Sequence, residues 1–186
     1  VLSASGNLDH DRVVALADTL LSAMPAVGTN GSAIATEAAL YIGGEHRQDR
    51  DLEQLHLVLG FPGLALGDPD YYAASVLSTA FGGGMSSRLF QEVREKRGLV
   101  YSISSGVTAY SDAGSFTVYA GTSLDSVGEV IRLTVEELKR LKGEPIPADE
   151  LRRAKDHLKG SLMLSLENTG SRMSYLARQV AHPGAG

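Results

Sequence analysis

Three consecutive glycines, Gly82, Gly83 and Gly84, are the feature that most constrains how this chain can fold. Residues without a Cβ allow a backbone turn that other residues would resist, so a turn is expected here. Ser86 or Ser87 can cap a helix after the turn, because a serine hydroxyl accepts a hydrogen bond from the first amide groups of a helix. The sequence therefore predicts a glycine turn that leads directly into a helix.

After the glycines, the apolar residues are spaced first as in a helix and then as in a strand. Leu89, Phe90 and Val93 form an apolar stripe, and Gly98 is a typical helix stop. Beyond the stop, every second residue fits one face of a strand: Tyr101, Ile103, Val107 and Ala109. Tyr101 is therefore expected where a helix passes into a strand, and two rigid elements at such a junction can hold a functional side chain in place.

Composition excludes several classes of protein. The 186 residues are 43% hydrophobic, which is enough for one sizeable core or two small ones. A net charge of -5 with mixed signs argues against nucleic acid as a partner, since binding to phosphates needs a concentrated basic surface. The chain has no cysteine, so it has neither disulfides nor thiolate metal sites. No apolar run is long enough to span a bilayer.

The remaining periodicities predict an α+β fold in which one mostly antiparallel sheet carries helices on one face. Besides the strand at 101–109, strands are expected at residues 1–5, 36–42, 55–61 and 116–120. Helices are expected from about residue 10 to near Pro25, at 127–141 and 151–166, and around 173–180. A further helix is expected to end at Gly82, with Asp68 as its N-cap and Pro69 at its first helical position.

The two ends of the chain suggest that it is a piece of a longer polypeptide. It opens on a strand pattern at Val1 without an initiator Met, and it closes at Gly186 soon after a helical pattern. Residues 25–35 are short, polar and glycine-bearing, with no period of either kind, and are expected to be a linker.

The common hydrolytic motifs are missing. The five histidines include no pair at i,i+4, so no helix can present two imidazoles to a zinc ion: His10, His46, His56, His157 and His182. Glu45 beside His46 is best explained as part of a solvated loop, because adjacent side chains on an extended chain point to opposite sides. No serine lies in a G-x-S-x-G motif, and the glycine turn lacks the lysine of a phosphate-binding loop.

Arg94 and Tyr101 remain as candidates for chemistry. They lie seven residues apart across Gly98, one on the predicted helix and one on the predicted strand, so their side chains could converge. A guanidinium can donate hydrogen bonds to a substrate carbonyl, and a tyrosine hydroxyl can stabilise an oxyanion. The spacing alone fits a solvated basic helix equally well, because several further basic residues lie nearby. These are Arg88, Lys96 and Arg97.

Three stretches of the sequence resemble one known family. The run FGGGMSSRLFQEVREKRGLVYSISS closely resembles the second-domain signature of the pitrilysin and mitochondrial processing peptidase family of zinc metallopeptidases, and is most similar to its bacterial processing-protease branch. The stretches GGEHRQDRDLEQLHLVLGFPG and GTSLDSVGEVIRLTVEEL resemble the same family, so the similarity covers nearly the whole chain.

The resemblance implies a fold of αββ-type units and a division of labour between two homologous domains or subunits. One carries an H-x-x-E-H motif that binds zinc. The other contributes an arginine and a tyrosine seven residues apart, which here are Arg94 and Tyr101, to contact the peptide and stabilise its reacting carbonyl. The glycine turn at Gly82, Gly83 and Gly84 matches a loop that helps to bind the extended peptide.

This chain lacks the H-x-x-E-H motif, so the resemblance implies that it is the metal-free domain, inactive alone, of an intact zinc metalloendopeptidase. Residues 1–24 would end the preceding homologous domain, and residues 36–186 would form the substrate-binding domain, truncated at its C-terminus. The implied partners are a peptide or unfolded polypeptide and a zinc-bearing domain or subunit, in the bacterial cytoplasm or periplasm. The alternative is a catalytically inactive scaffold or interaction subunit of the same fold.

Overall fold

The computed structural model describes residues 1–24 and 39–181 of the 186-residue chain. The predicted linker at 25–35, the start of the strand predicted at 36–42, and His182 lie outside the described residues. The described part divides into two compact units, of which the larger holds residues 39–162 and the smaller joins the N-terminal segment to residues after 162. No helix in the described ranges combines the length and the apolar character needed to cross a membrane.

The larger unit is built on a three-stranded antiparallel sheet in the order β1-β3-β2. The strands are β1 (Leu55–Gly63), β2 (Val100–Ala109) and β3 (Gly114–Thr122). In the central strand, Ala120 lies opposite Leu57 on one side and Ile103 on the other. The turn between β2 and β3 is closed by the Tyr110 N–H, which donates to the Ala113 carbonyl at 2.7 Å. The strands predicted at 101–109 and 116–120 are therefore present, and they form a hairpin.

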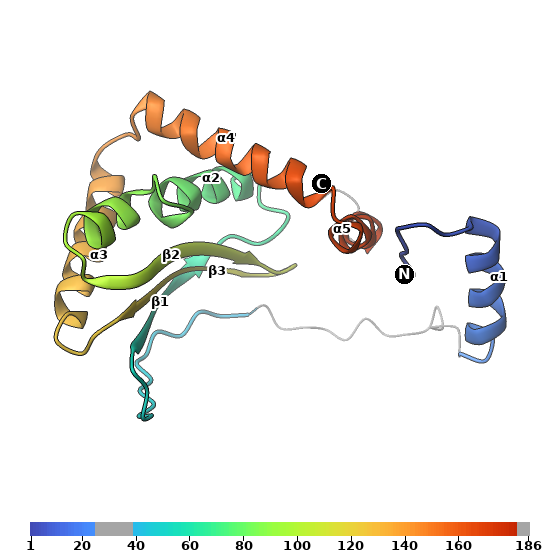
Figure 1. The fold of residues 1–186 in the computed structure, drawn as a ribbon, viewed down its shortest axis with the longest axis horizontal. Coiled ribbons are helices and arrows are strands. Elements are labelled where there is room, and N and C mark those ends of the chain that lie inside the picture. The colour runs from blue at the N-terminus through green and yellow to red at the C-terminus, as the bar shows by residue number, and fades with distance from the viewer. Residues whose placement is uncertain (25–38, 182–186) are drawn as a thin grey trace. The chain divides into compact units, whose positions relative to one another are not determined.

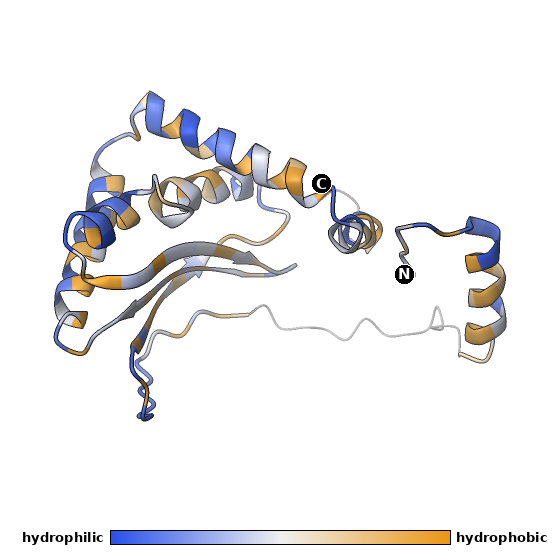
Figure 2. Ribbon diagram, in the orientation of Figure 1, coloured by the Kyte–Doolittle hydropathy of each residue, from blue (hydrophilic) through white to orange (hydrophobic). Residues whose placement is uncertain are grey.

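Helices cover one face of this sheet, as Figure 1 shows. Their bounds are α2 (Tyr71–Gly82), α3 (Val127–Gly143) and α4 (Ala148–Ser165), with a short π-helix, η1 (Phe90–Glu95), between α2 and β2. Figure 2 shows that the first turns of α4 are mostly hydrophilic, whereas α2 and the strands carry more hydrophobic residues. The predicted α+β class, an antiparallel sheet with helices on one face, is confirmed.

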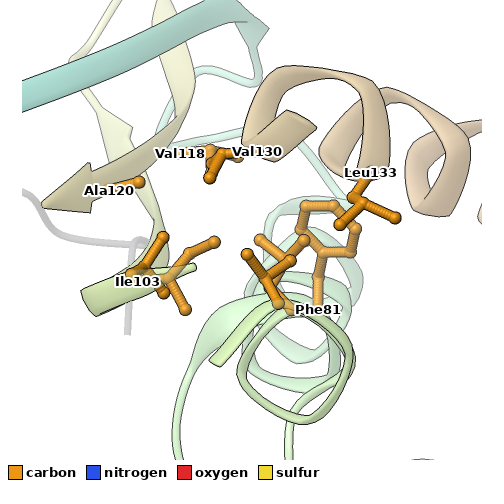
Figure 3. Packing of buried hydrophobic residues seen from close by; sticks show 9 residues of the cluster. Phe81, Ile103, Val118, Ala120, Val130 and Leu133 are labelled. Atoms are coloured by element: carbon orange, nitrogen blue, oxygen red, sulfur yellow. The ribbon is translucent and has the colours of Figure 1, made fainter. Parts of the chain in front are cut away.

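The core lies between the sheet and the helices (Figure 3). Phe81 from α2, Val93 from η1 and Val130 from α3 are fully buried. They pack against Ile103 and Val118, which point from the sheet toward the helices. Burial of apolar surface is the main favourable term in folding, so this cluster fixes η1 against the start of β2. That junction contains the candidate site residues.

The smaller unit contains two helices, α1 (His10–Leu21) and α5 (Thr169–Ala181). The Asp9 carboxylate caps α1 by accepting a hydrogen bond from the Arg12 N–H at 2.8 Å. The Ser3 hydroxyl donates to the Met173 carbonyl at 2.8 Å. Both helices agree with the periodicities that predicted them.

Two predicted strands are not formed. Residues 1–5 have no strand structure, and neither do residues 39–42, the described part of the strand predicted at 36–42. A strand needs a neighbour for its backbone hydrogen bonds, and no strand in the described ranges pairs with either segment. Tyr41 contacts the sheet through its side chain instead, since its hydroxyl donates to the Gly60 carbonyl at 2.9 Å.

Helix α2 begins two residues later than predicted, at Tyr71 instead of Pro69. The Asp68 carboxylate accepts a hydrogen bond from the Asp70 N–H at 2.9 Å, and the Asp68 carbonyl accepts one from the Tyr71 N–H at 3.0 Å. This local turn competes with the first turn of a helix. Asp68 therefore closes a turn, and the helix starts at Tyr71.

Candidate functional site

Close packing explains the first two glycines of the turn. A Cβ on Gly82 would lie 2.5 Å from the Ser105 backbone nitrogen, and one on Gly83 would lie 2.6 Å from the Thr79 Cα. Gly83 has a φ of -82°, so a left-handed backbone is not the cause. The predicted turn is present. Its physical reason is the close approach of α2 to β2 and the tight end of α2.

The third glycine, Gly84, leaves room for a side chain. Gly84 lines a pocket of about 370 Å³ between the turn and the N-terminal half of α4, where a Cβ would lie 3.5 Å from the His157 Cε1. The predicted serine cap is not formed. The Ser87 hydroxyl is buried without a hydrogen-bond partner among the described residues, and the Ser86 side chain makes no hydrogen bond with them. The Ser87 carbonyl, not its hydroxyl, accepts the Gln91 N–H at 3.0 Å.

The helix after the turn widens into the π-helix η1. The Lys96 N–H donates to the Gln91 carbonyl at 3.0 Å, five residues earlier, whereas the sequence predicted ordinary helical spacing. Leu89 and Val93 are buried, as their spacing predicted. A π-helical turn changes the direction of the residues that follow it, and such turns are frequent at functional sites.

Three of the four basic side chains here are paired with carboxylates. Arg88 donates to both Glu150 oxygens, at 2.7 and 3.0 Å, and this hydrogen bonding raises the pKa of Arg88. Lys96 and Arg97 both bind Glu92, and the Arg97 contact measures 2.9 Å. Hydrogen bonds from Lys96 and then Arg97 lower the pKa of Glu92. Each of these three cations therefore has a carboxylate partner within the chain.

Arg94 is the exception. Its guanidinium makes no ion pair or hydrogen bond with the described residues, and its central carbon lies 4.7 Å from the centroid of the Phe90 ring. An arginine over an aromatic face is held by a modest cation–π attraction that leaves its N–H groups available. Arg94 is also solvent-exposed. Its donors are therefore free to bind a ligand.

Gly98 ends the helix, as predicted. Its φ of +63° lies in the left-handed region, where a glycine is favoured. The Gly98 N–H donates to the Arg94 carbonyl at 2.9 Å, and the Leu99 N–H donates to the Val93 carbonyl at 3.1 Å. These bonds close the end of η1 and lead the chain straight into β2.

Tyr101 occupies a β-bulge that the sequence did not predict. Val100 lies opposite Thr122 and Ser102 lies opposite Gly121, so Tyr101 is an extra residue on β2. A bulge re-aims a side chain, and bulges are common beside active sites. Tyr101 is 62% exposed, and its hydroxyl forms no hydrogen bond with the described residues. Arg94 and Tyr101 thus flank the Gly98 turn, each with unused hydrogen-bonding groups.

The residues present do not fit a zinc ion. Within residues 1–24 and 39–181, no three His, Cys, Asp or Glu side chains are grouped closely enough to hold a metal. His56 is engaged with the Tyr119 hydroxyl, at 2.8 Å from its Nδ1, and His157 lies by the pocket beside Gly84. No step of a reaction can be assigned to a metal held by the described part of this chain.

Comparison with known proteins matches this chain to a family. The family described as "Peptidase M16 inactive domain" matches residues 1–158. An uncharacterized zinc protease of Streptomyces coelicolor is 41% identical, over 96% of this chain and 40% of its own length. Another uncharacterized zinc protease, from Bacillus subtilis, is 46% identical over 67% of this chain and 31% of its length. The chain therefore spans less than half the length of these relatives.

Solved structures agree with the sequence comparisons. The peptidase M16 inactive domain from Pseudomonas fluorescens is 34% identical, with a TM-score of 0.59 over 68% of this chain and 30% of that chain. A chain of Complex III2 from Candida albicans is 26% identical, with a TM-score of 0.76 over 94% of this chain and 43% of that one. The chain belongs to the family of peptidase M16 inactive domains.

Proposed function

We propose that this chain is the non-metal-binding domain of a zinc-dependent endopeptidase. It binds the peptide substrate and stabilises the reacting carbonyl, while another domain or subunit holds the zinc. Three observations support this assignment. The relatives from Streptomyces coelicolor and Bacillus subtilis are named zinc proteases, the chain spans less than half of their length, and its described residues do not fit a metal.

The observation that carries the proposal is the unpaired guanidinium of Arg94. Its basic neighbours, Arg88, Lys96 and Arg97, are each bound to a carboxylate, so among the described residues of this cluster only the Arg94 guanidinium lacks a carboxylate partner. A guanidinium donates hydrogen bonds from a planar fork, which suits the carbonyl oxygens of an extended peptide. Arg94 would hold the substrate backbone next to the bond that is cleaved.

Tyr101 would stabilise the charge that develops on the reacting carbonyl. Its hydroxyl is a free donor on an exposed bulge, and a positioned donor is worth most where an oxyanion forms in the transition state. Three glycines are proposed to help bind the peptide. Gly84 lines a pocket, whereas Gly82 and Gly83 allow the tight turn that precedes Gly84.

The Arg94→Ala change should weaken binding of an unfolded peptide about tenfold, because it removes charge-assisted hydrogen bonds. Fluorescence anisotropy with a labelled peptide measures the dissociation constant. Lys96→Ala is the matched control, since this side chain lies on the same segment but is already paired with Glu92. Equal affinities for the Arg94→Ala variant and the unsubstituted chain would remove Arg94 from the peptide site.

A second candidate is an interaction subunit without catalysis. The structural match to a chain of Complex III2 from Candida albicans, over 94% of this chain, favours it. The two candidate functions differ in whether a zinc-binding motif is encoded together with the chain. An H-x-x-E-H motif in the same polypeptide or in a neighbouring gene supports the endopeptidase, and its absence from both supports the interaction subunit.

A further inference from the structure

The face of the sheet that turns away from the helices carries no charge. None of the three strands contains Asp, Glu, Lys or Arg, although 21% of the chain is charged. The helix side of the sheet is marked by Leu57, Ala120 and Ile103, which are paired across the three strands and pack against the core. Successive side chains of a strand point to opposite faces, so the residues next to these three in each strand face away from the helices. The strand side chains on this face carry hydroxyl, imidazole and apolar groups, such as the exposed Val58, and no carboxylate, ammonium or guanidinium group.

Four polar side chains on this face gather around Gly121, in the central strand β3. Gly121 lies opposite His56 on β1 and Ser102 on β2. A Cβ on Gly121 would lie 3.0 Å from the Ser102 Oγ, 3.1 Å from the Gln54 Oε1 and 3.4 Å from the Tyr119 hydroxyl oxygen. The glycine thus allows side chains from three neighbouring segments to approach one point.

Much of the hydrogen-bonding capacity of this cluster is unused. His56 and Tyr119 are bonded to each other at 2.8 Å, with their rings stacked at a centroid distance of 6.0 Å. The Ser102 hydroxyl and the Gln54 amide make no hydrogen bond with described residues, and neither does the second ring nitrogen of His56. The cluster therefore offers both donors and acceptors, all of them neutral groups or a histidine.

We propose that Gln54, His56, Ser102 and Tyr119 form a subsite around Gly121 that binds a carboxamide group of the peptide substrate. A carboxamide has a donor and an acceptor side by side, which matches the mixed and uncharged character of the cluster. Ser102 directly follows Tyr101 in β2, so a peptide held at Tyr101 lies within reach of the subsite. The inference rests on the proposed function and adds a contact that selects among peptides. The carboxamide belongs either to the peptide backbone or to an Asn or Gln side chain.

The test is peptide binding by the Gln54→Ala, Ser102→Ala double variant, measured by fluorescence anisotropy with a labelled peptide that contains Asn and Gln. Loss of two hydrogen-bonding groups should weaken binding about tenfold. Thr108→Ala is the control, because Thr108 lies on the same face of β2 opposite Ser115, far along the strand from Gly121, and should leave affinity unchanged. Gly121→Ala fills the space between the side chains and should weaken binding comparably, with thermal unfolding recorded to verify folding.

Two altered peptides identify the source of the carboxamide. One is N-methylated along its backbone, and the other has Ala in place of each Asn and Gln. If the double variant and the unsubstituted chain bind one of these peptides with equal affinity, that peptide lacks the group that the subsite binds. If the double variant binds both altered peptides more weakly than the unsubstituted chain does, the carboxamide assignment is wrong.

The two proposals fail in different ways. If the double variant binds every peptide as well as the unsubstituted chain while Arg94→Ala binds more weakly, the subsite is wrong and the proposed function stands. If the unsubstituted chain binds no peptide, both are wrong.

Discussion

In the zinc-dependent enzyme proposed above, the Tyr101→Phe change is expected to lower kcat about a hundredfold, the scale for removing one donor to an oxyanion. The substitution deletes a single oxygen from an exposed side chain that has no hydrogen-bond partner in the described structure, so folding should be unaffected. The donor acts where charge develops, and therefore KM should change little. Steady-state kinetics with a fluorogenic peptide separates the two parameters.

A matched control for this prediction is Tyr110→Phe. Tyr110 is 64% exposed at the turn between β2 and β3, so the change removes the same atom from the same protein away from the bulge. Its kcat should equal that of the unsubstituted enzyme. An unchanged kcat for Tyr101→Phe would mean that this hydroxyl does not stabilise the transition state.

The second large effect concerns stability and the glycine turn. Gly82→Ala should lower the free energy of unfolding by about 3 kcal/mol, because the added Cβ would lie 2.5 Å from the Ser105 backbone nitrogen, which a rotamer change cannot relieve. Gly84→Ala should change it by less than about 0.5 kcal/mol, since its Cβ would make ordinary contact with His157 at 3.5 Å. Urea unfolding of the two variants measures both values.

The pair of variants separates two roles of the turn. If Gly84→Ala keeps full stability but binds peptide more weakly, the open end of the turn contacts substrate. Equal losses of stability for Gly82→Ala and Gly84→Ala would contradict the packing account, in which the fold needs a glycine at position 82 and tolerates a side chain at position 84.

Much of the fold could be predicted from local patterns. Alternating apolar residues identified β1, β2 and β3, and helical stripes identified α1 to α5, because burial of one face imposes these periods on the sequence. Gly98 was recognisable as a helix stop for a similarly local reason, a left-handed backbone that glycine adopts without strain. No strand forms at 1–5 or at 39–42, the described part of the strand predicted at 36–42, because pairing depends on a neighbouring strand, which the period of a segment does not reveal.

The features that distinguish the candidate site residues are not local. The π-helical bond from Lys96 to Gln91 and the bulge at Tyr101 arise where η1 and β2 are packed against the core, and neither has a residue signature. Arg94 could not be told from Arg88 in the sequence, because the partner of Arg88, Glu150, lies 62 positions away. The resemblance singled out Arg94 and Tyr101, and the structure adds that both have unused hydrogen-bonding groups.

Complementation tests the central claim most directly. The proposed partner, a zinc-bearing domain or subunit that contains H-x-x-E-H, is prepared alone, and its rate of peptide cleavage is measured while the chain is added. We predict negligible cleavage by either component alone and a rate that rises with added chain until it saturates. Full activity of the zinc-bearing component alone, or no activity at any amount of added chain, would contradict a substrate-binding half-site in this chain.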